Sequence, residues 1–210
     1  MLTLVIGDRN LSSWSLRPWL AARQAGLSFA EVTVRLNQPD TGAQIARYSP
    51  SGKVPCLIDQ RGDERLLIWD SLAICEYLAE LAPSLWPADR ARRAEARSIS
   101  AEMHSGFGAL RQQMPMDVRA KRPGEAIPPQ VGAEIARIAT IWESCRTRFA
   151  AAGPFLFGAF SIADAMYAPV VWRFRTYGVA LPPAALAWHE MMSALPAMRE
   201  WQAGALAEPH

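Results

Sequence analysis

The first 81 residues contain short apolar runs separated by two stretches with helical spacing. Leu2–Ile6 is an apolar run of strand length, and Phe29–Val34 alternates between apolar and polar positions. Pro18 is tolerated in the first turn of a helix that Gly26 ends. The elements predicted are, in order, strand 2–6, helix 17–26, strand 29–34, an irregular segment 41–47, hairpin strands 56–58 and 66–68, and helix 70–81. This order is βαβ-ββα.

The pattern changes after a segment with prolines at positions 83 and 87, because everything beyond it has helical periodicity. We therefore expect a domain at 1–81, a linker at 82–88 and an all-α domain at 89–210. The helices predicted there are one long helix from 89 to about 114, a second at 130–151 after a proline-rich interruption, and shorter ones at 161–177, 184–192 and 197–206.

Composition limits the classes of function. The net charge of +2 and a mixed-sign helix start at 89–97 do not favour a nucleic-acid partner, and no run reaches the ~18 apolar residues of a membrane span. The apolar N-terminus lacks a signal-peptide pattern. Three cysteines without paired spacing and scattered histidines predict a reduced, cytoplasmic protein without a metal site.

An extended chain edge ahead of a helix start is the most informative local feature. Val54-Pro55 exposes the backbone of Val54 at a strand entry, and Asp70-Ser71 opens the helix that follows the hairpin. The first amides of a helix attract anions. Together these features predict a site for an extended, anionic, peptide-like ligand.

These residues, with the serines after the first strand and the Ser161-x-x-Asp164 capping box, resemble the cytosolic glutathione S-transferase family. Each piece is short, but their order and spacing cover nearly the whole chain. The resemblance implies a thioredoxin-like N-terminal domain, an all-α substrate domain, glutathione as co-substrate and a homodimer. The serine-rich motif is closest to the bacterial, serine-type, zeta- or tau-like members.

The resemblance implies that a serine hydroxyl donates a hydrogen bond to the glutathione sulfur. Such a bond favours the thiolate, which is scarce at pH 7 when the thiol pKa is near ~8.5. Ser12 lies five residues before Arg17, the spacing of family members, and Ser13 is the second candidate. Ser15 is expected to cap the helix. Alternatively, all three are ordinary turn and cap residues.

The remaining glutathione contacts also follow from the resemblance. Val54 would pair with the cysteinyl backbone beside a cis Pro55, and Lys53 would face the glycyl carboxylate, unless it is a solvated turn lysine. Asp70 would bind the γ-glutamyl ammonium and Ser71 its carboxylate, although the family more often has Glu at the first position. Both could instead be simple helix caps.

A stripe on the long helix is the candidate site for a small hydrophobic electrophile. Its proposed substrate-binding members are Met103, His104, Phe107 and Arg111, and it could equally be core.

Trp14 stands where some relatives carry cysteine, which argues against thiol–disulfide chemistry. The leading expectation is therefore a detoxifying glutathione transferase. A maleylacetoacetate- or maleylpyruvate-type isomerase and a non-catalytic glutathione-binding regulatory protein are the alternatives.

Overall fold

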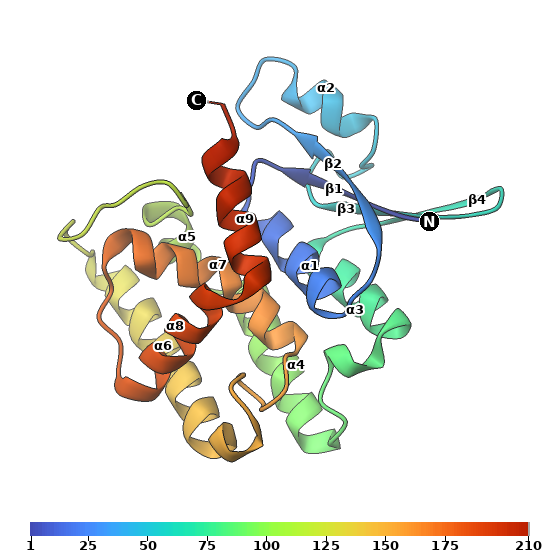
Figure 1. Cartoon of the computed structure of the whole chain (residues 1–210). Helices are drawn as coiled ribbons and strands as arrows, with labels where there is room; N and C mark the ends of the chain where they lie inside the picture. The colour runs from blue at the N-terminus through green and yellow to red at the C-terminus, as the bar shows by residue number, and fades with distance from the viewer. Residues whose placement is uncertain (210) are drawn as a thin grey trace.

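The computed structural model describes residues 1–209 and has a four-stranded mixed sheet in its N-terminal half (Figure 1). The strands are β1 (Leu2–Gly7), β2 (Phe29–Val34), β3 (Cys56–Arg61) and β4 (Glu64–Ile68), in the order β2-β1-β3-β4. The pair β1–β2 is parallel, and the pairs β1–β3 and β3–β4 are antiparallel. The predicted βαβ-ββα, thioredoxin-like arrangement is confirmed.

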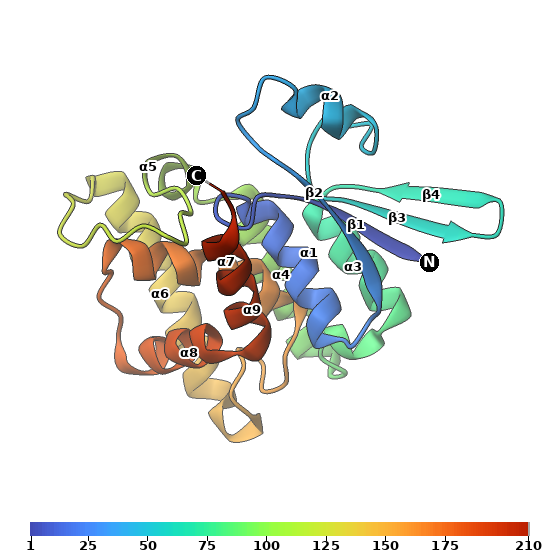
Figure 2. The ribbon, with the colours of Figure 1, turned by 45° about the horizontal axis from the view of Figure 1, so that its top comes forward.

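Helices cover both faces of this sheet (Figure 2). The larger core lies under α1 (Ser13–Gln24) and α3 (Ser71–Leu81), and it receives Leu4 and Ile6 of β1. Val5, between them, points to the other face and joins a smaller cluster with Ile45 of α2 (Thr41–Ala46). Alternate residues of one strand therefore serve two cores, as the two-residue period of a strand requires.

The C-terminal half is helical, as predicted. Its elements are the 3-10 turn η1 (Pro83–Leu85), α4 (Arg90–Ser105), α5 (Gly108–Gln113), α6 (Pro129–Phe149), the 3-10 turn η2 (Ala150–Ala152), α7 (Ile162–Tyr177), α8 (Pro183–Ala194) and α9 (Pro196–Ala207). Nearly every residue of α7 is buried, because this helix packs between α4 and α1. No helix within residues 1–209 is long and apolar enough to cross a membrane.

Several predicted boundaries were wrong. The segment 41–47 is not irregular but contains α2, and α1 begins at Ser13 instead of at residue 17. The expected single helix from 89 to 114 ends at Ser105, because Phe107 has a left-handed backbone (φ 58°) before α5 starts. A left-handed residue cannot continue a right-handed helix, so the side chains on either side of this break do not share one straight stripe.

The predicted capping box at the start of α7 is confirmed. Ser161 is the N-cap, and its backbone amide donates to Asp164 Oδ2 at 2.9 Å. The buried Asp164 carboxylate also accepts from the Leu156 amide at 2.9 Å and the Trp188 indole at 3.0 Å. One carboxylate thus ties α7 to α8 and to the preceding loop.

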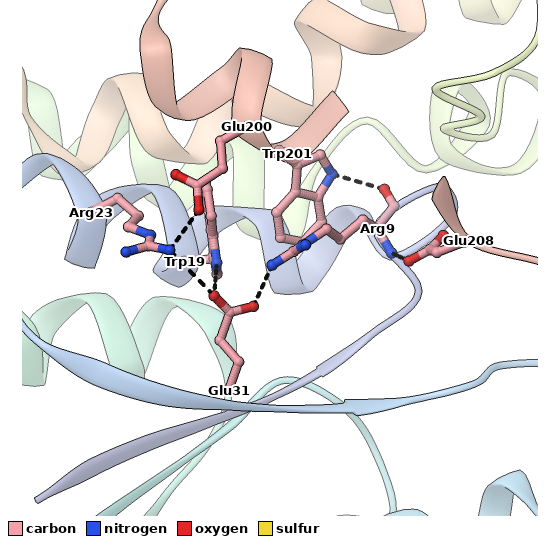
Figure 3. A network of polar contacts seen from close by, with 7 residues as sticks. All are labelled: Arg9, Trp19, Arg23, Glu31, Glu200, Trp201 and Glu208. Atoms are coloured by element: carbon pink, nitrogen blue, oxygen red, sulfur yellow. Dashed lines mark hydrogen bonds and ion pairs between the residues drawn. The ribbon is translucent and has the colours of Figure 1, made fainter. Parts of the chain in front are cut away.

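A polar network joins the two halves of the molecule (Figure 3). Glu31 of β2 accepts hydrogen bonds from Arg9 at 2.5 Å and from the Trp19 indole at 3.0 Å. The Arg9 guanidinium lies 5.7 Å from the ring centres of both Trp19 and Trp201, and the Trp201 indole donates to the Arg9 carbonyl. Helix α9 is therefore held against the loop that connects β1 to α1.

Candidate active site

A cavity of about 350 Å³ lies where the loop before β3, the start of α3 and helix α4 meet. Its lining residues are Trp14, Ser51, Lys53, Val54, Pro55, Trp69, Asp70, Ser71 and His104. It gathers all five predicted glutathione-binding residues, and His104 from the predicted electrophile set. A hollow of about 560 Å³ beside Glu76 and Trp86 is larger, but none of the predicted binding residues lines it.

The backbone at Val54 is shaped for an extended partner. The Val54–Pro55 peptide bond is cis, as expected, and Gly52 takes a left-handed conformation (φ 65°) in the preceding turn. Pairing between β1 and β3 ends at Val5 with Cys56, so Val54 lies just outside this ladder. Val54 and Pro55 both line the cavity.

Asp70 is the N-cap of α3. Its Oδ1 accepts hydrogen bonds from the amides of Leu72 at 3.0 Å and Ala73 at 3.4 Å. Its Oδ2 lies 2.9 Å from Nε2 of His104, which α4 supplies from the other half of the chain. The Asp70 side chain is still 54% exposed. The capping role is therefore present, and the carboxylate remains within reach of a ligand in the cavity.

The three serines form a buried group between β1 and α1. Ser15 is not a helix cap as expected: its hydroxyl accepts the Gly7 amide at 3.1 Å and the Ser12 hydroxyl at 2.7 Å. Ser12 is the N-cap residue of α1 but makes no side-chain capping bond, and Ser13 is the first helical residue. Neither Ser12 nor Ser13 is among the cavity-lining residues, so their role toward a sulfur stays a prediction.

Trp14 forms the wall of the cavity between these serines and α4. Its ring meets His104 edge-on, with centres 5.5 Å apart, and carries the Arg17 guanidinium at 4.2 Å and that of Arg111 at 5.6 Å. Burial lowers the pKa of Arg17 to about 9 and lowers that of Arg111 as well. A flat aromatic wall backed by positive charge thus borders the site.

The helical stripe predicted for an electrophile divides in the structure. His104 lines the cavity, and Arg111 reaches its wall through Trp14. Met103 and Phe107 are buried in the main core, together with Leu110 and Met114, and do not line the cavity. The break after Ser105 turns the later positions into a different direction. Contact of these residues with a substrate remains a prediction.

The described residues give little support for chemistry at the cysteines or at a metal ion. The thiols of Cys56, Cys75 and Cys145 are buried, and burial raises the pKa of each, to about 12 for Cys75 and about 11 for Cys145. Buried thiols with raised pKa are inert at neutral pH. Residues 1–209 hold no cluster of three His, Cys, Asp or Glu side chains suited to a metal; His210 lies outside the described residues.

Sequence reasoning missed three residues around the cavity. Ser51 and Trp69 line it, and Arg17, which entered only as a spacing marker, lies behind Ser71 with its Nη1 3.5 Å from the Ser71 hydroxyl. Ser51 and Trp69 could have been found as neighbours of the Val-Pro and Asp-Ser motifs. Arg17 offered no comparable signal, because a lone arginine in a helix usually faces solvent.

Comparison with known proteins agrees with this geometry. Residues 11–81 match the family model for the glutathione S-transferase N-terminal domain, and residues 93–201 match that for the C-terminal domain. A Burkholderia glutathione transferase homologue, solved with bound glutathione, is 25% identical with a TM-score of 0.72, and the match covers 99% of each chain.

Two solved isomerases are also similar in fold. One is maleylacetoacetate isomerase from Anaeromyxobacter dehalogenans, at 24% identity and a TM-score of 0.69, over 99% of this chain and 98% of that one. The other is a bacterial zeta-class maleyl pyruvate isomerase, at 23% identity and a TM-score of 0.72, over 99% of this chain and 100% of that one. At this identity the likeness is one of fold.

Proposed function

The chain belongs to the glutathione S-transferase family, and from this premise we propose that it binds glutathione in the cavity beside Trp14 and transfers its sulfur to an electrophilic small molecule. The observation that carries the proposal is the convergence on one cavity of Val54, Pro55, Asp70 and Ser71, from two separate motifs. A backbone edge and a helix start suit an extended peptide with a charged end.

In this proposal each part of the tripeptide meets a suitable group. The γ-glutamyl ammonium lies at Asp70 and its carboxylate at Ser71, where the first amides of α3 favour negative charge. The cysteinyl backbone pairs with Val54, and Lys53 faces the glycyl carboxylate. The electrophile lies toward Trp14 and His104, and the active form is a homodimer.

The thiol is activated by a hydroxyl at the start of α1. A charge-assisted hydrogen bond of ~1.5–3 kcal/mol would lower the thiol pKa by about 1–2, which brings it close to neutrality. The Ser12 hydroxyl donates a hydrogen bond to the Ser15 hydroxyl, so it must turn away from Ser15 to donate to a sulfur. Ser13 is not part of the hydrogen bond between Ser12 and Ser15. Both Ser12 and Ser13 are therefore tested.

The test begins with calorimetric titration of reduced glutathione into the full chain, followed by thiolate absorbance of the complex against pH. We expect binding, and a bound-thiol pKa below the free value of ~8.5. Ser12→Ala or Ser13→Ala should raise that pKa by about 1–2. Ser98→Ala is the control, because the Ser98 hydroxyl donates to the Ala94 carbonyl within helix α4.

Absence of binding would refute the proposed function. Binding with an unshifted thiol pKa would instead indicate a binding protein without sulfur activation. Rates with a panel of electrophiles, and with a cis-dienoic acid that is isomerised without net conjugation, then distinguish transfer from isomerisation.

A further inference from the structure

Glu208, just beyond α9, contacts the loop between β1 and α1 (Figure 3). Its Oε1 accepts a hydrogen bond from the Arg9 amide at 2.5 Å, and its Oε2 accepts one from the Asn10 amide at 3.1 Å. Glu208 is half-buried, and its backbone carbonyl accepts a hydrogen bond from the Arg119 guanidinium. One carboxylate of the C-terminal half thus binds two successive amides of the N-terminal half, through charge-assisted hydrogen bonds.

Further hydrogen bonds from the C-terminal half hold the same two loop residues. The Trp201 indole donates to the Arg9 carbonyl at 2.8 Å. The amides of Val118 and Arg119 donate to Asn10, the first to its carbonyl at 3.3 Å and the second to its side-chain oxygen at 3.0 Å. The backbone amide and carbonyl of both loop residues are therefore bonded to the C-terminal half.

This loop leads directly into the serines that we propose to activate the thiol. The Ser12 amide donates to the Asp8 carbonyl at 2.8 Å, and the Ser13 amide donates to the Leu11 carbonyl at 2.9 Å. The two residues held by the C-terminal half lie between these acceptors in the chain. A hydroxyl that donates to a sulfur must be held to within about 0.5 Å, because hydrogen bonds weaken steeply away from their best geometry. The position of the loop therefore decides the strength of that bond.

We propose that Glu208 is a positioning residue that fixes the loop 8–11 and, through it, the hydroxyl that activates glutathione. This inference rests on the proposed function, in which that hydroxyl donates to the sulfur. The residues proposed to bind the rest of the tripeptide lie before β3 and at the start of α3. Loss of the Glu208 carboxylate should therefore raise the pKa of the bound thiol and leave the affinity for the tripeptide nearly unchanged.

The first experiment measures thiolate absorbance of the glutathione complex against pH. Glu208→Ala removes both acceptor oxygens, and Glu208→Gln retains one. Glu200→Ala is the matched control, because Glu200 of α9 instead accepts from Arg23 in the last turn of α1, at 2.6 Å. We expect Glu208→Ala to raise the bound-thiol pKa by about 0.5–1, half the shift expected for Ser12→Ala, which is a 3- to 10-fold smaller thiolate fraction at low pH. Glu208→Gln should raise it by less, and Glu200→Ala should not change it.

Two further measurements separate positioning of the hydroxyl from a general loss of structure. The affinity for S-methylglutathione, which has no ionisable thiol, is measured by calorimetry and should stay within about threefold of the wild type in every variant. Amide hydrogen exchange in the ligand-free chain tests the two bonds to Glu208 directly. Exchange at Arg9 and Asn10 should be faster in Glu208→Ala than in the wild type or in Glu200→Ala.

Several results would overturn this role of Glu208. They are an unchanged bound-thiol pKa in Glu208→Ala, an equal rise in Glu200→Ala, or unchanged exchange at Arg9 and Asn10 in Glu208→Ala. A loss of S-methylglutathione affinity in Glu208→Ala that exceeds the loss of thiolate would also overturn it, because the whole site would then be disturbed. If the wild type does not bind glutathione, or binds it with an unshifted thiol pKa, the proposed activation fails first, and this inference with it.

Discussion

His104 Nε2 lies 2.9 Å from Asp70 Oδ2, so a helix of the C-terminal half contacts the cap of a helix in the N-terminal half. The same carboxylate holds the amides of Leu72 and Ala73 through its other oxygen. Asp70 therefore combines three tasks: it caps α3, it joins the two halves, and it borders the cavity.

Two substitutions separate capping from ligand binding at this position. Asp70→Asn keeps a good N-cap, and we expect the free energy of unfolding to change by less than about 0.5 kcal/mol. Asp70→Ala removes the cap and should cost about 1 kcal/mol. Both remove the negative charge, so both should weaken glutathione binding to a similar degree. Urea denaturation measures the stability, and calorimetry measures the affinity. If Asp70→Asn kept the wild-type affinity and Asp70→Ala alone lost it, a direct contact between Asp70 and the ammonium would be contradicted.

Glu31 is expected to be important for the contact between the two halves (Figure 3). Glu31→Gln replaces a carboxylate that serves Arg9, Arg23 and the Trp19 indole, and it leaves the Arg9 guanidinium with less charge compensation. We expect a loss of about 1–3 kcal/mol in the free energy of unfolding. Glu64→Gln, at an exposed position on β4, is the control and should change it by less than about 0.5 kcal/mol. Equal effects would show that the network adds no stability.

Asp164, in the capping box of α7, makes the stability of the fold depend on pH. Burial raises the pKa of Asp164 from 3.8 to about 6, against the opposing effect of its hydrogen bonds. Between these values the folded chain binds more protons than the unfolded chain, so this group's contribution to stability falls as pH rises from about 4 to about 6. The loss amounts to about 3 kcal/mol and is complete above pH 6.

Comparison with Asp164→Asn isolates this dependence, because other groups titrate equally in both proteins. The variant should be less stable than the wild type, and the difference should be larger at pH 4 than at pH 7. Urea denaturation at pH 4, 5, 6 and 7 measures it. A difference that grows with pH would mean that hydrogen bonding outweighs burial and lowers the pKa of Asp164.

Two helical glycines should respond in opposite directions to alanine. A Cβ at Gly204 of α9 would clash with Nη1 of Arg9, so Gly204→Ala displaces the guanidinium from its place between the two indoles. A Cβ at Gly132 of α6 meets no atom of the described chain within 4 Å. We expect Gly132→Ala to stabilise the fold by up to about 1 kcal/mol, which raises the midpoint of thermal unfolding. Gly204→Ala should lower that midpoint. The same sign for both would argue against close packing of α9 on Arg9.

Some features of the site could be predicted because they depend on neighbours in the chain. The Asp70 cap, the capping box at Ser161 and the position of Val54-Pro55 are local patterns, and the structure has each of them where the sequence places it. The expected cap at Ser15 was wrong for a tertiary reason, since its hydroxyl is taken by Gly7 of the adjacent strand and by Ser12. A sequence pattern does not indicate that competition.

Sequence patterns alone were enough to predict the βαβ-ββα order, the helical second half and the two motifs of the cavity, because apolar spacing, prolines and caps act on the backbone within a few residues. Three further features could be seen only in the folded chain: His104 meets Asp70, Arg17 is buried behind Ser71, and the helix breaks at Phe107. These depend on how separate elements pack against one another, and packing joins residues that no local pattern connects.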